Sequence, residues 1–291
     1  MIRHLPDIMI DPIVRMGLAE DLGRAGDVTA QACIPHGARM RAVVGARKAG
    51  VLAGMGCMRL AVLAMDPEAR VSIHVADGDG FEAGTALAEI EGDARALLSA
   101  ERTGLNLLGR LSGIATLTRD YVQAVDGAGR PGRGARIADT RKTTPGLRAL
   151  EKHAVACGGG INHRFGLDDA ILIKDNHVLV CGGVEAAVTR ARAMAGHLMK
   201  IELEVDGLAQ LDQALALIDQ GRGPDVVMLD NFSLDMLREA VARVAGRVTL
   251  EASGGVNLTT VRGIAETGVD VISVGGLTHS ATVLDIGLDA F

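Results

Sequence analysis

Residues 201–230 read IELEVDGLAQLDQALALIDQGRGPDVVMLD. The apolar runs at 201–205 and 226–229 have the length and the Val, Ile and Leu content of buried strands. Between them, residues 208–220 carry apolar side chains at helical spacing. A strand, a helix and a strand in this order predict a parallel pair joined by a right-handed crossover.

The same alternation continues on both sides of this stretch. Further apolar runs lie at 136–139, 170–173, 248–251 and 271–274, and helical patterns lie at 183–194, 234–244 and 258–267. Six or seven parallel strands favour a closed or nearly closed α/β barrel, although an open sheet is not excluded by the sequence.

The first hundred residues follow a different pattern. A helix is expected at 11–22, with Asp11 as N-cap and Pro12 at the first helical position. Short strands at 41–47, 71–75 and 86–90, with a helix at 57–65, predict an α+β region. A long helix over 93–125 follows, and the glycine-rich residues 126–134 end it.

Composition excludes several classes of protein. The 291 residues carry a formal charge of -6 and only 2% aromatic side chains, which argues against a nucleic-acid binder. The four cysteines lack metal-ligand spacing, which is typical of the reduced cytoplasm. No leader or membrane-spanning segment is expected, so the sequence predicts a cytoplasmic protein.

Cationic side chains follow two of the predicted barrel strands. Arg141 and Lys142 come after the run at 136–139, Lys174 closes the run at 170–173, and a glycine-rich turn between them delivers His163 and Arg164. In α/β barrels, reactive side chains lie at the carboxyl ends of strands, so these groups predict an anion-binding sector. The alternative is a solvated run of charges.

Acidic and glycine-rich strand ends complete the predicted rim. Glu202 and Glu204 share one strand face, and Asp230 ends the next strand, an arrangement that suits Mg²⁺ unless these carboxylates merely balance the nearby cations. Ser253-Gly254 and Gly275 expose backbone N–H groups of the kind that hold phosphate. Together, the cationic, acidic and glycine-rich strand ends predict a site in which a small polyanion reacts with a magnesium-bound phosphorylated partner.

One arginine lies outside this rim. Arg102 falls between Leu98 and Leu105 on one stripe of the long helix, so it is expected to point towards apolar packing or an interface. Snorkelling, or pairing with an internal carboxylate, is the alternative.

Long ordered motifs make the chain resemble the quinolinate phosphoribosyltransferases, the decarboxylating enzymes of NAD biosynthesis. The motifs are DTRKTTPGLR at 139–148, KHAV at 152–155, GGGINHRFGL at 158–167 and ILIKDNH at 171–177. Further motifs are SAERT at 99–103, LSGIAT at 111–116, ELEVD at 202–206, LDNF at 229–232, EASGG at 251–255 and VGGLTHS at 274–280.

The resemblance implies a type II phosphoribosyltransferase fold and a homodimer or an assembly of dimers. Residues 1–114 would form an α/β sandwich domain, with residues 280–291 as candidates to pack against it. Residues 115–291 would form an incomplete α/β barrel of about seven strands. The activity implied is transfer of phosphoribosyl from phosphoribosyl pyrophosphate (PRPP) to quinolinate, followed by loss of CO₂.

The resemblance also assigns roles to single residues. Arg102 would reach the active site of the neighbouring subunit. The two carboxylates of quinolinate would be held by Thr140, Arg141, His163, Arg164 and Lys174. PRPP would be bound by Lys142, Lys174, Glu204, Asp230, Ser253, Gly254, Gly275 and His279, with Glu204 and Asp230 near Mg²⁺. Of these, Lys142, Lys174, Glu204 and Asp230 are the expected catalytic residues.

Departures from the family and rival functions are few. Gly276 stands where many relatives have alanine and Ala252 where many have serine, so slight effects on phosphate contacts are expected. The rivals are a molybdenum-transport-associated paralogue of the same fold, a Schiff-base lyase using Lys174, and a relative that binds without catalysis.

Overall fold

The structure is a computed structural model that describes residues 4–130 and 133–291. Residues 1–3 of the start and residues 131–132 of the predicted glycine-rich loop lie outside the described residues. The chain divides into two compact units. The first comprises residues up to Arg119 with Thr143–Gly159 and Leu277–Phe291, and the second comprises Asp120–Lys142 and Gly160–Gly276.

The second unit contains the predicted parallel sheet. Its order is β8-β13-β12-β11-β10-β9, and every pair in it is parallel. The strands are β8 (Arg136–Ala138), β9 (Ile171–Ile173), β10 (Ile201–Val205), β11 (Val226–Asp230), β12 (Thr249–Ser253) and β13 (Val271–Ser273). Beside β8, a single parallel bridge joins Ala138 to Ile161 and is the only trace of a seventh strand in the described part of this sheet.

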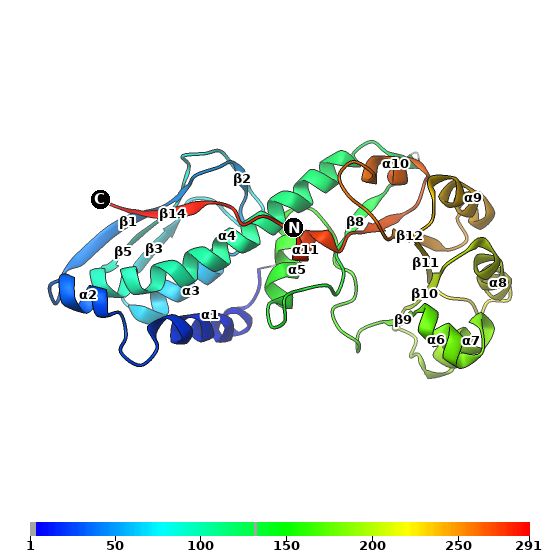
Figure 1. Cartoon of the computed structure of the whole chain (residues 1–291), viewed down its shortest axis with the longest axis horizontal. Helices are drawn as coiled ribbons and strands as arrows, with labels where there is room; N and C mark the ends of the chain where they lie inside the picture. The colour runs from blue at the N-terminus through cyan, green and yellow to red at the C-terminus, as the bar shows by residue number, and fades with distance from the viewer. Residues whose placement is uncertain (1–3, 131–132) are drawn as a thin grey trace. The chain divides into compact units, whose positions relative to one another are not determined.

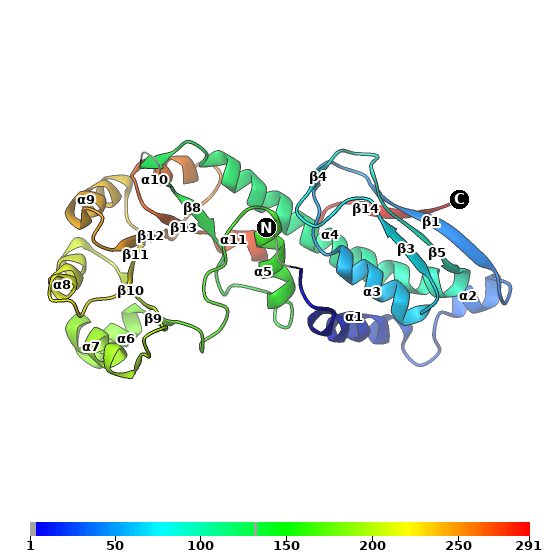
Figure 2. The same cartoon turned by 180° about the vertical axis from the view of Figure 1, so that it is seen from behind.

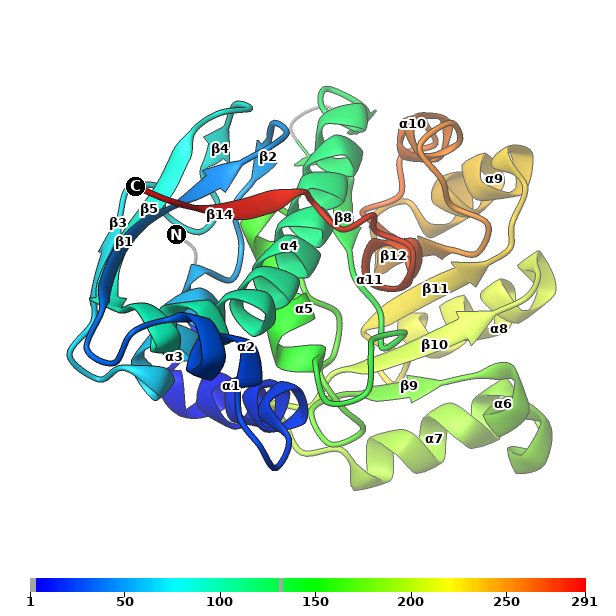
Figure 3. The same cartoon turned by 60° about the vertical axis from the view of Figure 1, so that its left-hand side comes forward.

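Helices alternate with these strands, as the sequence predicts. They are α6 (Asp175–Cys181), α7 (Val184–Met194), α8 (Leu208–Asp219), α9 (Leu234–Val244) and α10 (Val261–Glu266), and Figure 3 shows α7, α8 and α9 along the outer side of the strands. Ile201, Leu203 and Val205 share one face of β10 and are fully buried, and Glu202 on the other face is 7% exposed, so both faces of this strand are covered. A short hairpin of β6 (Gly129–Arg130) and β7 (Arg133–Gly134) completes the unit.

The first unit is built on an antiparallel sheet of order β14-β1-β5-β3 (Figure 1). Its strands are β1 (Arg39–Ala46), β3 (Arg70–Ile73), β5 (Ala86–Asp93) and β14 (Ile286–Ala290), with β2 (Gly50–Val51) and β4 (Gly80–Phe81) paired separately. Pairing of β14 with β1 brings the end of the chain into this unit.

Helices cover one face of the antiparallel sheet. Figure 2 shows α1, α3 and α4 on that face. The helices assigned in this part of the chain are α1 (Asp7–Leu22), α2 (Val28–Cys33), α3 (Met55–Met65), α4 (Ala94–Ala124), α5 (Arg148–Cys157) and α11 (Gly276–His279). The division by contacts differs from the predicted boundary after residue 114, because Glu151 and His153 of α5 bond to Arg110 and Asp77 of the first unit.

One helix boundary was predicted wrongly. α1 begins at Asp7 with Pro6 as N-cap, and Pro12 lies inside the helix. Asp11 does not cap the helix but pairs with Arg15 one turn later, at 2.7 Å. An i,i+4 ion pair and an N-cap use the same residue types, so the sequence did not distinguish them. Among the described residues, no helix is long and apolar enough to cross a membrane.

Candidate active site

The carboxyl ends of the six parallel strands bring most of the predicted residues to one edge of the second unit. Parallel strands end on the same side of their sheet, and the segments after them form the rim of the barrel. The predicted residues in this unit are Thr140, Arg141, Lys142, His163, Arg164, Lys174, Glu204, Asp230, Ser253, Gly254 and Gly275. Arg102 and His279 belong to the first unit.

Two arginines form the cationic part of the rim. Burial lowers the pKa of Arg164, and the like charge of Arg141 lowers it further, so the two guanidinium groups act on each other. The Nη1 of Arg164 donates to the carbonyl oxygen of Ala170 at 3.2 Å. The Nε of Arg141 is buried and has no hydrogen-bond partner among the described residues. A buried charged donor without an acceptor is costly, so this pair fits an anion that fills the gap.

His163 is held in a fixed orientation by its neighbours. Its Nδ1 accepts a hydrogen bond from the backbone N–H of Arg164 at 2.8 Å, so the ring proton is on Nε2. Nε2 lies 2.8 Å from Oε2 of Glu202 and donates to it. The buried Asp139 accepts the backbone N–H of His163 at 2.8 Å and the side chain of Asn162 at 2.7 Å. In this arrangement both ring nitrogens of His163 are engaged by the protein, and the arginines supply positive charge to the sector.

Two buried carboxylates lie beside His163. Glu202 on β10 is 7% exposed and Glu251 on β12 is 4% exposed. Burial raises the pKa of Glu251 to about 7, and the charge of Glu202 contributes in the same direction. The Oε1 atom of each glutamate has no hydrogen-bond partner among the described residues. The sequence placed both residues at the ends or faces of strands but assigned no role to Glu251.

A second acidic cluster lies at the ends of β10 and β11. Glu204, Asp206 and Asp230 each offer a carboxylate oxygen, and these atoms lie within 4.8 Å of one another. Burial raises the pKa of Glu204, Lys174 opposes this shift, and the negative charge of Asp230 adds to it. Carboxylates that raise one another's pKa suit a divalent cation, so the donor set fits Mg²⁺. Asp206 was missed, although its period-two spacing from Glu204 was visible in the sequence.

Lys174 faces this acidic cluster. Its Nζ lies 3.6 Å from Oε2 of Glu204, and its side chain is 50% exposed. Its backbone N–H donates to Nδ1 of His177 at 2.8 Å, which fixes the start of α6. Lys174 is therefore a half-exposed lysine at the start of α6 whose charge faces the acidic cluster.

Close backbone packing explains the glycine at the end of β12. Gly254 has a φ of +92°, and a Cβ there would lie 2.1 Å from Oδ1 of Asn231. Asn231 follows β11, and its N–H donates to the carbonyl oxygen of Ser253 at 2.9 Å. At Gly276 a Cβ would meet nothing within 4 Å, so the alanine of many relatives would fit there.

The two predicted residues of the first unit are exposed. The Arg102 side chain is 64% exposed and lies 3.7 Å from Glu101, so it does not point towards apolar packing within this chain, and its place at an interface stays a prediction. His279 is exposed, and its Nδ1 lies 2.7 Å from Oγ of Ser280. Sequence reasoning also missed the buried Glu151, which binds Arg110 at 2.7 Å.

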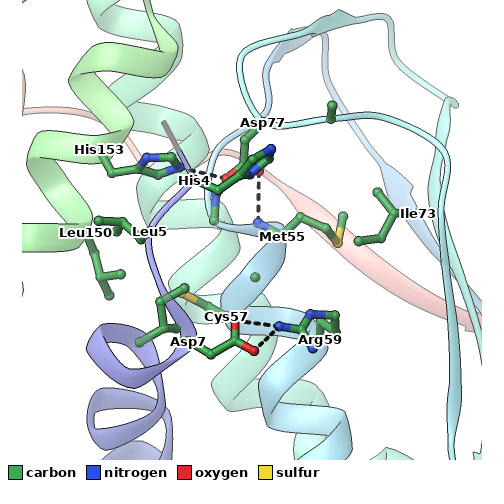
Figure 4. A pocket seen from close by; sticks show the side chains of 14 residues that line it. His4, Leu5, Asp7, Met55, Cys57, Arg59, Ile73, Asp77, Leu150 and His153 are labelled. Carbon is green, nitrogen blue, oxygen red and sulfur yellow. Dashed lines mark hydrogen bonds and ion pairs between the residues drawn. The ribbon is translucent and has the colours of Figure 1, made fainter. Parts of the chain in front are cut away.

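The first unit holds a pocket of about 280 Å³ (Figure 4). His153 and Asp77 point towards each other in it, with Nε2 and Oδ2 2.9 Å apart. Asp77 also accepts the backbone N–H of Met55 at 3.1 Å, which holds the start of α3. Burial raises the pKa of Cys57 to about 12, so this thiol stays protonated and is a poor nucleophile. The contacts of Asp77 with His153 and Met55 indicate that these residues have a structural role.

Comparisons with known proteins cover nearly the whole chain. Residues 27–112 match the N-terminal domain of quinolinate phosphoribosyl transferase, and residues 114–289 match its C-terminal domain. A nicotinate-nucleotide pyrophosphorylase [carboxylating] of Mycobacterium leprae is 45% identical over 284 residues, which are 95% of each chain. A probable enzyme of the same name from Bacillus subtilis is 43% identical over 93% of this chain and 89% of its own. The solved nicotinate-nucleotide pyrophosphorylase of Francisella tularensis is 37% identical, with a TM-score of 0.92 over 100% of this chain and 99% of its own.

Proposed function

The chain belongs to the quinolinate phosphoribosyltransferase family, and from this premise we propose how its own residues carry out the family's reaction. The protein is a decarboxylating phosphoribosyltransferase of NAD biosynthesis. It transfers phosphoribosyl from PRPP to the ring nitrogen of quinolinate and yields nicotinate mononucleotide, pyrophosphate and CO₂. The observation that carries the site assignment is the unpartnered Nε of Arg141 beside Arg164.

Quinolinate binds at the arginine sector. Its two carboxylates supply the acceptor that the Nε of Arg141 lacks and pair with the charge of Arg164, and Thr140 and Lys174 complete the binding of the dianion. A pair of unit charges 4 Å apart contributes about 4 kcal/mol at an effective dielectric near 20, before desolvation is subtracted. Two such pairs favour a dicarboxylate over a monocarboxylate such as nicotinate. His163 borders the same sector, with its Nε2 held by Glu202.

PRPP binds at the acidic and glycine-rich sectors. Glu204 and Asp230, with Asp206 next to them, are the side chains that would hold Mg²⁺. When bound, this cation neutralises the charge of the pyrophosphate leaving group. Lys142 and Lys174 contact the same phosphates. Backbone N–H groups near Ser253, Gly254 and Gly275, and the His279 side chain, would hold the 5′-phosphate.

The residues orient the reactants and require no general base for the first step. The nucleophile is the unprotonated ring nitrogen of quinolinate, and the pocket aligns it with C1′ of PRPP, which develops oxocarbenium character. Bond formation makes the ring a pyridinium, which stabilises the electron pair left at C2 when the 2-carboxylate departs. Lys174 holds that carboxylate before it leaves.

The family resemblance is the ground for the proposed assembly, and the exposure of Arg102 agrees with it. A charged side chain that is 64% exposed in its own chain is available to a second copy. The protein acts as a homodimer, or as an assembly of dimers, in which Arg102 completes the neighbouring site. Cytoplasmic localisation remains a prediction from the cysteine pattern.

The rival functions have less support. A Schiff-base lysine is activated by desolvation or by a neighbouring cation, whereas Lys174 is half exposed and faces the carboxylate of Glu204. The molybdenum-transport paralogue and the non-catalytic binder are tested by the assay for products.

The function is tested with the purified protein, quinolinate, PRPP and Mg²⁺. We expect nicotinate mononucleotide, pyrophosphate and CO₂ in equal amounts, and we expect none of them when Mg²⁺ is chelated. Chromatography of the nucleotide and a coupled pyrophosphate assay measure the products. Nicotinate in place of quinolinate serves as control, and turnover of nicotinate at the same rate would contradict the dicarboxylate pocket.

Glu204→Gln is expected to weaken Mg²⁺ activation. Loss of one charged oxygen ligand costs about 1–3 kcal/mol, which is roughly a 10- to 100-fold rise in the Mg²⁺ concentration for half-maximal rate. Titration of the rate with Mg²⁺ measures this shift. Glu266→Gln is the control, because that side chain is 55% exposed at the end of α10 and pairs with Arg262. An unchanged Mg²⁺ requirement in Glu204→Gln would show that Glu204 does not bind the metal.

A further inference from the structure

The buried Asp139 at the end of β8 has no part in the reaction as described so far. It is 0% exposed and follows Ala138, the last residue of the strand. Its N–H donates to the carbonyl oxygen of Ile161 at 3.1 Å, beside the bridge that joins Ala138 to Ile161. An acidic side chain is seldom fully buried unless its oxygens are engaged, so its partners indicate what it does.

The carboxylate of Asp139 holds two consecutive residues of the segment that precedes β9. Oδ1 accepts the backbone N–H of His163 at 2.8 Å, and Oδ2 accepts a side-chain N–H of Asn162 at 2.7 Å. Hydrogen bonds to a carboxylate are stronger than those between neutral groups. The segment is therefore tied to the end of β8 by a side chain as well as by the backbone.

This constraint extends to Arg164. The Nδ1 of His163 accepts the N–H of Arg164 at 2.8 Å, and Nε2 lies 2.8 Å from Oε2 of Glu202 on β10. The imidazole is thus fixed at both nitrogens, and it fixes the backbone at residue 164. At its far end, the Arg164 side chain donates to the carbonyl oxygen of Ala170 at 3.2 Å. Arg164 therefore has a defined place relative to Asp139.

Arg141 is placed by the same aspartate through the chain itself. It follows Asp139 by two residues, so the residue that anchors the 162–164 segment also begins the segment that carries Arg141. Burial lowers the pKa of Arg164, and the charge of Arg141 lowers it further, so the two guanidinium groups repel each other. Like charges separate unless their backbones are held. Asp139 links the two backbones, because its own leads to Arg141 and its carboxylate holds the segment that carries Arg164.

We propose that Asp139 is a positioning residue that holds Arg141 and Arg164 at the spacing of two carboxylates on adjacent ring carbons. The proposal rests on the proposed function, because quinolinate carries its carboxylates on adjacent carbons. Asp139 is fully buried and acts through the two arginines. A rigid pair of arginines distinguishes such a dicarboxylate from an isomer of the same charge whose carboxylates lie farther apart.

Asp139→Ala tests the proposal with two unreactive probes, benzene-1,2-dicarboxylate and benzene-1,3-dicarboxylate. Both are dianions, so loss of the negative charge of Asp139 acts on both alike, and only the spacing of their carboxylates distinguishes them. We expect the wild type to bind the 1,2 isomer about 10-fold more tightly or better. In Asp139→Ala this preference should fall to about 3-fold or less, because the 162–164 segment loses two hydrogen bonds to a carboxylate. Calorimetric titration of the whole protein measures both dissociation constants.

Steady-state kinetics gives a second measure that a general loss of packing would not reproduce. In Asp139→Ala the KM for quinolinate should rise about 10- to 100-fold, since hydrogen bonds to a charged group no longer hold the arginine pair. The KM for PRPP should rise by a smaller factor, because most of the groups proposed to hold PRPP follow β10, β11 and β12. A similar rise in both constants would indicate a structural role only.

Asp270→Ala is the matched control at the opposite end of the sheet. Asp270 directly precedes β13, its N–H donates to the carbonyl oxygen of Leu250 at 2.9 Å, and its Oδ2 accepts the N–H of Leu250 at 2.9 Å. These bonds resemble those of Asp139, but they lie at the amino ends of the strands. We expect Asp270→Ala to lower the melting temperature and to keep both the preference for the 1,2 isomer and the wild-type KM for quinolinate.

The outcomes separate the two proposals. No turnover of quinolinate by the wild type would overturn the proposed function itself. Turnover by the wild type, with equal binding of the two isomers or with an unchanged preference in Asp139→Ala, would overturn only the role of Asp139. If Asp139→Ala does not fold, Asp139→Asn decides, because asparagine keeps the shape but offers one acceptor oxygen in place of two. We expect its preference to fall about 3-fold or more, and the wild-type preference in this variant is incompatible with the proposed role.

Discussion

Arg141→Ala and Arg164→Ala each lower kcat/KM for quinolinate by roughly 100- to 1000-fold. Each substitution removes charge-assisted hydrogen bonds to a substrate carboxylate, and truncation of one partner in a buried charge pair costs about 2–5 kcal/mol. The effect of Arg141→Ala is the easier one to interpret. The buried Nε of Arg141 has no hydrogen-bond partner among the described residues, so its removal breaks no hydrogen bond of that atom within the protein. Steady-state kinetics and melting temperature measure the effect and the integrity of the fold.

A matched surface arginine distinguishes this effect from a general loss of charge. Arg238→Ala on α9 removes a half-exposed guanidinium paired with Asp235 and should leave kcat/KM unchanged. Arg164→Lys should recover little activity, because an ammonium does not reproduce the two parallel donors of a guanidinium. Near-normal turnover of quinolinate by both alanine variants would show that the dianion binds elsewhere.

The sequence predicted the parallel sheet well because its strands carry apolar side chains in patterns typical of buried strands. The run at 201–205 became β10 with the same bounds, and the run at 226–229 became β11 with one more residue. In β11 the residues 226–229 are apolar on both faces, whereas β10 alternates apolar residues with Glu202 and Glu204, and both patterns are easy to recognise. α5 was not predicted, and it clusters with the first unit through bonds of Glu151 and His153. Such long-range contacts leave no local pattern.

The candidate site residues that could be predicted are those that lie at the ends of strands. Arg141, Lys174 and Glu204 could be found because each follows or closes an apolar run. The state of His163 could not, since it depends on a backbone N–H that only the folded turn supplies. The raised pKa of Glu251 could not be predicted for a similar reason, since it depends on the burial of β12 and on the charge of Glu202 from a strand that is not its sequence neighbour.

Mixed dimers of Arg102→Ala and Lys174→Ala recover activity that neither parent has. Arg102 lies on α4 with its side chain 64% exposed, and Glu101 at 3.7 Å is its one ion-pair partner among the described residues. Such a surface pair contributes little, so the guanidinium is free to serve a second subunit. Each homodimer variant should fall below about 1% of wild-type kcat, because every site lacks one cation that contacts substrate.

Recovery depends on which subunit supplies each residue. If Arg102 acts across the interface of a two-fold dimer, the Arg102→Ala subunit keeps its own Lys174 and receives Arg102 from its partner, so one of the two sites is complete. Random reassociation makes about half of the dimers mixed, and the specific activity should reach about a quarter of the wild type. If Arg102 acts within its own subunit, both sites of the mixed dimer are defective and activity stays at the level of the parents. Separation of the species by two different affinity tags makes the comparison direct, because a purified mixed dimer should then show about half of the wild-type kcat with an unchanged KM for quinolinate.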